Sequence, residues 1–319
     1  MNYDVFNGDA DGIIALLQLR LAFPQENKLI TGVKRDINLV AQVDPAAGEQ
    51  LTVLDISMEK NIEGVKRALS NGARVFYADH HRSGEIPVHE NLQANIDLDA
   101  DTCTALIIDK LLDGQFHAWA ITAAYGDNLI SKANQLAANA GLTKVQAELL
   151  KELGTLINYN GYGAKIDDLH FDPASLYRSL LKYPSPLDVI ADKASPFKQL
   201  QQAYQSDMTE ALAIKAKHSS ALLSVYLLPN AAWARRIGGV YGNLLANQDP
   251  DSAHAVLTEN ADGSYLLSLR APLSNKQGAG ELCSQFVTGG GRAAAAGINK
   301  LPKDKLNSFI DSVESFYQL

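Results

Sequence analysis

The chain has 319 residues, 46% of them hydrophobic, which is enough to bury the core of one large domain or, as we expect, two. Its formal net charge of −8 argues against the broad basic surface that long nucleic acid requires, but not against a short anion held at one cationic point. No apolar run reaches the length of about 18 residues that spans a bilayer, so we expect no membrane partner.

The first residues lead directly into an expected strand, without a basic and apolar export segment, and we therefore expect a cytoplasmic protein. The two cysteines, Cys103 and Cys283, lie far apart in apolar stretches. This spacing builds neither a disulfide framework nor a CxxC metal site, so both are expected to be reduced core thiols.

The first 130 or so residues alternate strand-like and helix-like segments. Strands are expected over 3–6, 29–33, 51–57 and 74–81, and helices over 12–23, 59–72 and 102–112. This alternation predicts βαβ units and a mostly parallel sheet. Ligands of such sheets bind at the carboxyl ends of the strands.

Residues 131–218 are expected to be helical, and after residue 219 the pattern changes to strands over 224–228, 254–260 and 264–271. We therefore expect an α/β first domain over 1–190, a helical linker over 191–218, and a smaller α+β domain over 219–319.

Ionisable residues follow the expected strands or stand near helix ends, at Asp9, Asp11, Asp55, the triplet Asp79–His81, and Asp127. Carboxylate oxygens and imidazole nitrogens are ligands of divalent cations, and a pair of cations needs ligands from several elements. The set Asp9, Asp11, Asp55, His80 and Asp127 would supply them. The pattern predicts a two-cation site suited to phosphoryl displacement.

An aspartate after a strand is also a common helix N-cap, and that interpretation stays open beside the ligand interpretation. Asp11 precedes an expected helix, and Asp55 stands before the helix expected near Glu59. Adjacent His80 and His81 after Asp79 at a strand end have no such simple packing explanation.

Four motifs in order, "NGDADG", "VLDIS", "ADHHRSG" and "AYGDN", resemble those of the DHH phosphoesterase superfamily. Near the C-terminus, "TGGGRAAAAGI" preceded by "LSLRAP" resembles the glycine-rich substrate clamp of the DHHA1 subfamily. The resemblance extends from residue 4 to residue 298 and implies a DHH domain joined to a DHHA1 domain.

The resemblance implies that Asp9, Asp11, Asp55, His80 and Asp127 bind two Mn²⁺ ions, with Mg²⁺ or Co²⁺ as alternatives and Asp55 as the catalytic bridge. It places His81 beside the scissile phosphate, where it would hold the phosphate or assist the leaving oxygen. Arg82 would add charge there, or be a solvated surface arginine. Many subfamily members have a histidine ligand a few residues before the first aspartate, where this chain reads "YDVFN". One metal site is therefore expected to be looser, or to be completed by Asn7 or by water.

In the second domain, Gly289, Gly290 and Gly291 precede an alanine run that is expected to be helical, which would make an anion cradle. Arg292 replaces the usual histidine of the family and would donate to phosphate or guanine. Arg270 is expected to make a second phosphate contact, with Asn275 and Lys276 as weaker candidates. Lys34 and Arg35 could reach the cleft, but we favour their interpretation as a charged loop.

The resemblance implies an enzyme of the nanoRNase type that cleaves 5'-phosphorylated diribonucleotides to mononucleotides. Arg292 favours a guanine-containing substrate such as pGpG, the linear product of cyclic-di-GMP breakdown. Alternatives within the superfamily are a 3',5'-bisphosphate nucleotidase and a single-strand exonuclease, and one from another class is a noncatalytic nucleotide-binding module. The sequence leaves the oligomeric state open, a dimer included.

Overall fold

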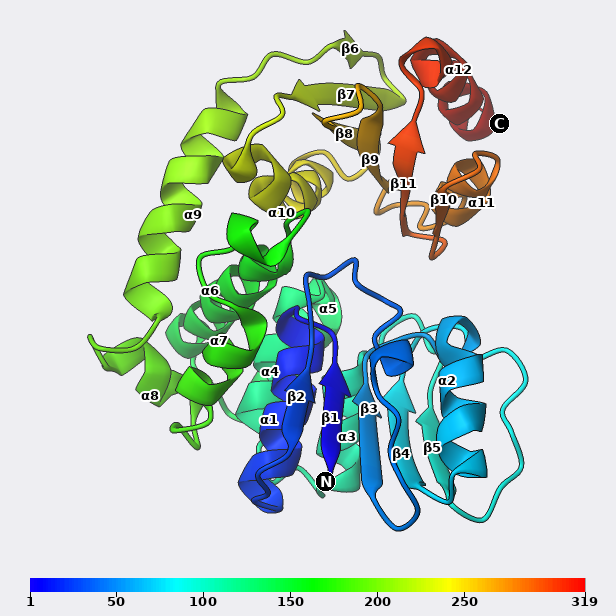
Figure 1. Ribbon diagram of the computed structural model, residues 1–319. Helices are drawn as coiled ribbons and strands as arrows, with labels where there is room; N and C mark the ends of the chain where they lie inside the picture. Colours follow the sequence, from blue (N-terminus) through cyan, green and yellow to red (C-terminus); the bar gives the residue numbers. More distant parts are fainter. Residues whose placement is uncertain (319) are drawn as a thin grey trace. The chain divides into compact units, whose positions relative to one another are not determined.

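The computed structural model describes residues 1–318, which form two compact units, the first over Met1–Gln202 and the second from Ala203 onward. The boundary falls within the helix α9 (Phe197–Leu212), inside the segment proposed above as a linker. Each unit has its own sheet (Figure 1).

The first unit is built on a parallel sheet with the strand order β2-β1-β3-β4-β5. The strands are β1 (Tyr3–Phe6), β2 (Lys28–Ile30), β3 (Gln50–Leu54), β4 (Arg74–Asp79) and β5 (Leu92–Ile96). The predicted α/β class is therefore confirmed. In this strand order the connections from β1 and β3 leave in opposite directions, and ligands bind where such connections diverge.

Helices cover both faces of this sheet. They are α1 (Ala10–Ala22), α2 (Met58–Ser70), α3 (Thr104–Leu111), α4 (His117–Gly126), α5 (Ile130–Asn139), α6 (Lys144–Gly161), α7 (Pro173–Leu180) and α8 (Pro186–Ala191), with the short 3₁₀ turns η1 (Val40–Gln42) and η2 (Ile166–Asp168). Helix α1 is buried from Ala10 to Arg20 and packs against α3, α4 and α6. An almost wholly apolar helix is expected in such a central position.

Alternation along the strands separates the two faces. Val5, Val53 and Tyr77 point into the core that α2 covers. On the opposite face, the buried Arg20 of α1 donates from Nε to Asp4 Oδ2 at 2.9 Å and from Nη2 to Thr52 Oγ1 at 3.2 Å. These contacts hold the last turn of α1 against β1 and β3.

The second unit has a mixed sheet with the order β10-β11-β9-β8-β7-β6, in which β7 and β8 are parallel and the other pairs are antiparallel. Its strands are β6 (His218–Ser219), β7 (Leu223–Leu228), β8 (Ala253–Glu259), β9 (Tyr265–Arg270), β10 (Gly289–Gly291) and β11 (Ala295–Leu301). Its helices are α10 (Ala232–Gln248), α11 (Ala279–Ser284) and α12 (Leu306–Tyr317), with the turn η3 (Lys303–Lys305).

The alanine run after Arg292 passes from a bend at residues 293 and 294 into strand β11, so the prediction of a helix there is wrong. Ala295 and Ala296 pair with Arg270 and Leu269 of β9, and Ala296 also pairs with Gly291 of β10. Alanine favours a helix only weakly, and pairing on both sides outweighs that preference. An anion cradle at a helix N-terminus is therefore not formed by these residues.

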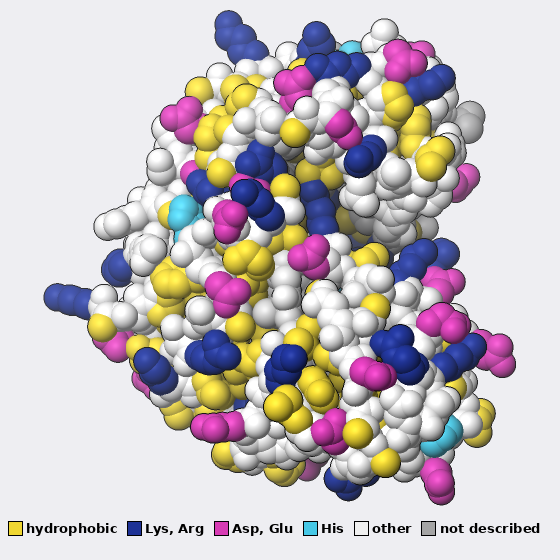
Figure 2. Space-filling model, in the orientation of Figure 1, with side chains coloured by type: hydrophobic (Ala, Val, Ile, Leu, Met, Phe, Trp, Pro, Cys, Tyr) yellow, Lys and Arg dark blue, Asp and Glu magenta, His cyan; other side chains and the backbone are white. Residues whose placement is uncertain are grey.

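Basic and acidic side chains are interspersed over the face drawn in Figure 2, in keeping with the net charge of −8. Among residues 1–318, none of the helices combines the length and the apolar character needed to cross a bilayer.

Candidate metal centre

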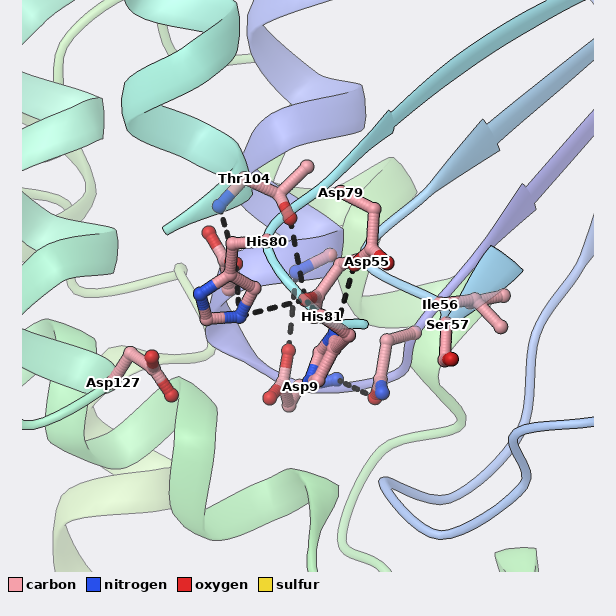
Figure 3. Close-up of polar contacts among 12 residues, drawn as sticks. Asp9, Asp55, Ile56, Ser57, Asp79, His80, His81, Thr104 and Asp127 are labelled. Carbon is pink, nitrogen blue, oxygen red and sulfur yellow. Dashed lines mark hydrogen bonds and ion pairs between the residues drawn. The ribbon is translucent and has the colours of Figure 1, made fainter. Parts of the chain in front are cut away.

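Most of the predicted ligands lie at the carboxyl ends of the parallel strands of the first unit. Asp9 and Asp11 follow β1, Asp55 follows β3, and His80 follows β4. Asp127 ends helix α4. Figure 3 shows Asp9, Asp55 and Asp127 in this region, with the imidazoles of His80 and His81 beside Asp55.

Asp9 is the N-cap of α1. Its Oδ1 accepts a hydrogen bond of 3.1 Å from the backbone N–H of Gly12, as an N-cap side chain should. A side chain at position 12 would collide with the chain, since a Cβ there would lie 2.3 Å from the carbonyl oxygen of Asn7. The "GDADG" motif thus contains the cap and the glycine that lets the helix begin close to the strand.

Asp11 caps a different helix from the one that the sequence suggested. Its two oxygens accept hydrogen bonds of 2.7 Å each from the backbone N–H groups of Thr104 and Ala105, at the start of α3. The side chain is buried, and its Oδ2 also lies 3.7 Å from His80 Nε2. Each carboxylate oxygen has two lone pairs, so each oxygen of Asp11 can still bind a further ligand while it caps α3.

Asp55 lies in the centre of the cluster, in a left-handed backbone conformation with φ 58°. Its Oδ1 accepts a hydrogen bond of 3.3 Å from Thr104 Oγ1. Burial raises the pKa of Asp55 well above its usual value, and the nearby carboxylates, Asp11 first, raise it further. The N-cap position of α2 is Ser57, whose side chain makes no capping hydrogen bond, so Asp55 is not the N-cap residue of this helix.

His80 presents one nitrogen to the carboxylates. Its Nδ1 lies 3.0 Å from the carbonyl oxygen of Thr102 and must donate to it, because a carbonyl only accepts. The other nitrogen, Nε2, lies 3.4 Å from Asp55 Oδ1. In neutral His80 this Nε2 carries a lone pair, which is the arrangement that metal-binding histidines show when a carbonyl holds the opposite nitrogen.

These residues fit a divalent cation. Asp55, His80 and His81 offer ligand atoms that all lie within 4.8 Å of one another. A buried carboxylate that faces an imidazole lone pair requires positive charge between them, either a proton or a metal ion. Oxygen and imidazole donors suit Mn²⁺ and related ions.

His81 is held by Asp79, a residue whose role the sequence analysis did not identify. His81 Nδ1 lies 2.7 Å from Asp79 Oδ1, and the Asp79 side chain is completely buried at the end of β4. The His81 side chain is 34% exposed. Because Nδ1 is occupied, Nε2 is the nitrogen that a substrate oxygen can reach.

Lys34 belongs to this cluster, contrary to its interpretation as part of a charged surface loop. Its ammonium group forms a close ion pair with Asp9 and lies 3.9 Å from Asp127 Oδ1. An ammonium group can only donate hydrogen bonds, so both carboxylates act as acceptors toward it. Burial alone would raise the pKa of Asp9, but the positive charge of Lys34 lowers it, and the pKa is lowered overall. Lys34 directly follows the strand expected over 29–33. Its position at the carboxyl edge of the sheet could therefore have indicated that it belongs to the site.

The remaining candidates of the first unit have local structural contacts. Asn7 is buried, donates from Nδ2 to the carbonyl of Lys34 at 3.3 Å, and accepts from the N–H of Asp9 at 3.3 Å. Arg82 is exposed, and its carbonyl accepts from Ser57 Oγ at 2.8 Å. A role of either residue toward a metal or substrate stays a prediction.

The candidates of the second unit lie on or next to β9 and β10, the two strands that flank β11. The guanidinium of Arg270 donates to Asn243 Oδ1 at 2.6 Å, to Ser268 Oγ at 2.8 Å, and to the carbonyl of Gly239 at 3.2 Å. Gly289, Gly290 and Gly291 form β10, and exposed Arg292 follows them. Arg270 thus supports the strand and helix around it, while substrate binding by these residues stays a prediction.

Comparison with protein-family models and with curated proteins gives no match. Among solved structures, the chain is similar to a pGpG-specific phosphodiesterase, PggH from Vibrio cholerae, with 15% identity and a TM-score of 0.60, over 100% of this chain and 99% of that one. It is similar to the exonuclease RecJ bound to manganese, with 15% identity and a TM-score of 0.58, over 99% and 90% of the two chains.

A second RecJ structure, from Thermus thermophilus and in complex with Mn²⁺, matches with 15% identity and a TM-score of 0.54. That match covers 99% of this chain and 52% of the larger protein. The likeness covers both units, with the ordered motifs at the carboxyl edge of the first sheet. The chain therefore shares the fold of these phosphodiesterase and exonuclease structures, in keeping with the resemblance of its motifs to the DHH phosphoesterase superfamily.

Proposed function

We propose that this chain is a metal-dependent phosphodiesterase that hydrolyses short 5'-phosphorylated oligoribonucleotides, diribonucleotides such as pGpG above all. The observation that carries the proposal is the approach of His80 Nε2 to Asp55 Oδ1, 3.4 Å apart and buried, with Asp11 Oδ2 3.7 Å from the same nitrogen. Buried carboxylate oxygens and an imidazole nitrogen this close together are stable around a cation, whereas without one their burial costs free energy.

Asp9, Asp11, Asp55, His80 and Asp127 would hold two Mn²⁺ ions, with Asp55 between them. Bound divalent ions lower the pKa of a water molecule and stabilise both oxygens of an in-line phosphoryl displacement. His81 would donate a hydrogen bond from Nε2 to the phosphate or to the leaving oxygen, while Asp79 fixes the ring through Nδ1.

The acidic net charge and the named specificity of PggH support a dinucleotide as substrate. In the second unit, Arg292, Arg270 and the glycines of β10 are the residues that we expect to contact the terminal phosphate or a guanine base. Gly290 is the glycine best suited to a close approach, since a Cβ there would meet nothing within 4 Å.

The test is a substrate panel with purified full-length protein and Mn²⁺. It contains pGpG, pApA, a longer single-stranded RNA and 3'-phosphoadenosine 5'-phosphate. We expect the dinucleotides to be cleaved fastest. An Asp127→Ala variant should lose at least about 100-fold in rate, because it removes a proposed metal ligand. Faster cleavage of the long strand would point to an exonuclease, and faster cleavage of the bisphosphate to a nucleotidase.

A noncatalytic nucleotide-binding module is the second candidate, and the Lys34 ammonium beside Asp9 is the observation that favours it. A lysine that permanently neutralises a ligand would leave a fold that binds nucleotides without cleaving them. Binding of pGpG in saturating Mn²⁺, with no mononucleotide released, would decide for this candidate.

A further inference from the structure

Lys34 lies where a cation would be expected. Besides the ion pair with Asp9, its Nζ donates to Asn158 Oδ1 at 3.2 Å and lies 3.9 Å from Asp127 Oδ1. Asn158 comes from α6 and is 2% exposed. Two carboxylates and an amide oxygen form the kind of oxygen set that binds hard divalent cations.

The backbone around Lys34 is held in place as well. Its N–H donates to the carbonyl of Gly161 at 2.8 Å, and its own carbonyl accepts from Asn7 Nδ2 at 3.3 Å. The ammonium also lies 5.4 Å from the centre of the Tyr162 ring, within the range of a cation–π contact. The Lys34 side chain is 24% exposed, so its position follows from specific contacts, unlike that of a solvated surface lysine.

The five proposed ligands therefore divide into two halves. The lysine half consists of Asp9 and Asp127, whose oxygens face Lys34. The histidine half consists of Asp11, Asp55 and His80, where the ion pairs that the structure records involve imidazole rings. A divalent ion in the histidine half meets negative charge, whereas one in the lysine half meets an ammonium group already in its place.

We propose that Lys34 is a tethered cation that competes with a metal ion for Asp9 and Asp127, so that the two ions bind in sequence and with unequal affinity. The first ion binds tightly at the histidine half. The second binds only when the ammonium group leaves the lysine half. This inference rests on the metal centre of the proposed function, and it assigns to Lys34 the control of how many ions that centre holds.

The test is direct counting of Mn²⁺ on metal-free, full-length protein, by calorimetric titration and by the electron paramagnetic resonance signal of free Mn²⁺. Three proteins are compared: wild type, Lys34→Met, and Lys60→Met as a matched control. Lys60 is an exposed residue of α2, so its substitution removes the same charge from the same unit without touching the cluster.

We expect the wild type and Lys60→Met to bind one ion tightly and a second at least about tenfold more weakly, and Lys34→Met to bind the second ion at least about tenfold more tightly than the wild type. Melting temperature gives an independent readout. Metal-free Lys34→Met should melt below the wild type, because Asp9 loses its counter-charge, and Mn²⁺ should raise its melting temperature by more.

Equal Mn²⁺ affinities for wild type and Lys34→Met would overturn the inference and leave the metal centre intact. Absence of Mn²⁺ binding in all three proteins would overturn the metal centre itself, and the inference with it. If Lys34→Met fails to fold, Lys34→Gln replaces it, since the neutral amide can still donate to Asp9 and Asn158. The same tightening of the second ion is then expected, and its absence counts against the inference.

Discussion

At the scale of single residues, Asp79 shows how the cluster orients His81. Its Oδ1 lies 2.7 Å from His81 Nδ1, and its Oδ2 is a buried oxygen with no hydrogen-bond partner within the described chain. Burying a carboxylate oxygen without a hydrogen-bond partner costs free energy, so such a residue calls for an explanation, and its contact with His81 provides one. Asp79 is therefore a positioning residue, which holds the His81 ring through Nδ1 and sets its orientation.

Substitution Asp79→Asn should lower kcat for pGpG by about 100-fold, because an amide makes a weaker hydrogen bond to His81 Nδ1 than a carboxylate and no longer fixes the ring. The number and affinity of bound Mn²⁺ ions should stay unchanged, since the resemblance places His81 on the substrate. Asp101→Asn, at an exposed position, is the control and should behave as wild type. Loss of Mn²⁺ from Asp79→Asn would instead place His81 on the metal, as its distance from Asp55 and His80 also permits.

The two cysteines should be unreactive in the native protein. Burial raises the pKa of Cys103 well above its usual value, and burial raises the pKa of Cys283 to about 12, with Arg270 opposing the shift. Because the thiolate is the reactive form, a pKa of about 12 leaves roughly one Cys283 in 10⁴ ionised at pH 8.

Ellman's reagent at pH 8 should therefore detect no thiol in the native protein within minutes, and both after unfolding in guanidinium chloride. The raised pKa of Cys283 also makes the stability of the fold depend on pH. A thiol pKa raised from 9.0 in the unfolded chain to about 12 stabilises the fold below pH 9, and this contribution is lost as the pH rises toward 12. Rapid labelling of the native protein at pH 8 would contradict the burial of these side chains.

At the scale of elements, strand β10 contains one glycine that is packed tightly against the backbone and one that faces open space. A Cβ at Gly289 would lie 1.8 Å from the carbonyl oxygen of Cys283, whereas a Cβ at Gly290 would meet nothing within 4 Å. Gly289→Ala should destabilise the protein by more than about 2 kcal/mol, because backbone must shift to admit the methyl group.

Gly290→Ala serves as the matched variant, and it should change the free energy of unfolding by less than about 0.5 kcal/mol. Urea unfolding followed by circular dichroism measures both values. If Gly290 contacts the substrate, Gly290→Ala should also weaken pGpG binding. Unchanged pGpG binding by a stable Gly290→Ala protein would remove this residue from the proposed substrate contacts.

Much of the first unit could be predicted because its strands and helices carry strong local patterns. The buried runs of β1, β3 and β4 alternate with α1 and α2, and this order alone implies a parallel sheet. Strand β5 was not among the predicted strands, since "LQANI" has no strong apolar run and its side chains are half-buried or exposed. Strand β11 was predicted as a helix because pairing partners distant in the chain are invisible to local propensity.

The candidate site was predictable to the same degree. Residues at strand ends meet through the topology, so the approach of Asp55 and His80 follows from the motif order. Contacts between loops and helices do not follow in this way. Thus the sequence does not reveal that Asp11 caps α3, or that Lys34 reaches Asp9. Those contacts depend on where loops turn, which no periodic pattern specifies.

At the scale of the whole molecule, the interspersed charges of Figure 2 and the net charge of −8 favour recognition of a few phosphates over tracking along a strand. We expect the logarithm of pGpG affinity to fall with the logarithm of salt concentration with a slope no steeper than about −2. Lengthening the RNA should not tighten binding. Titrations between 50 and about 200 mM KCl measure the slope. A slope near −5 with tighter binding of longer RNA would indicate an extended basic binding path.

The left-handed backbone at Asp55 has a consequence for how this protein can change through inheritance. Glycine, asparagine and aspartate adopt that conformation more readily than other residues, and aspartate alone among them carries charge. Asparagine and glycine are each one nucleotide away from aspartate in the genetic code. A single point mutation at this codon would therefore remove a proposed metal ligand while the backbone conformation is kept, which would give descendants of such a protein a short route from the proposed hydrolysis to pure ligand sensing.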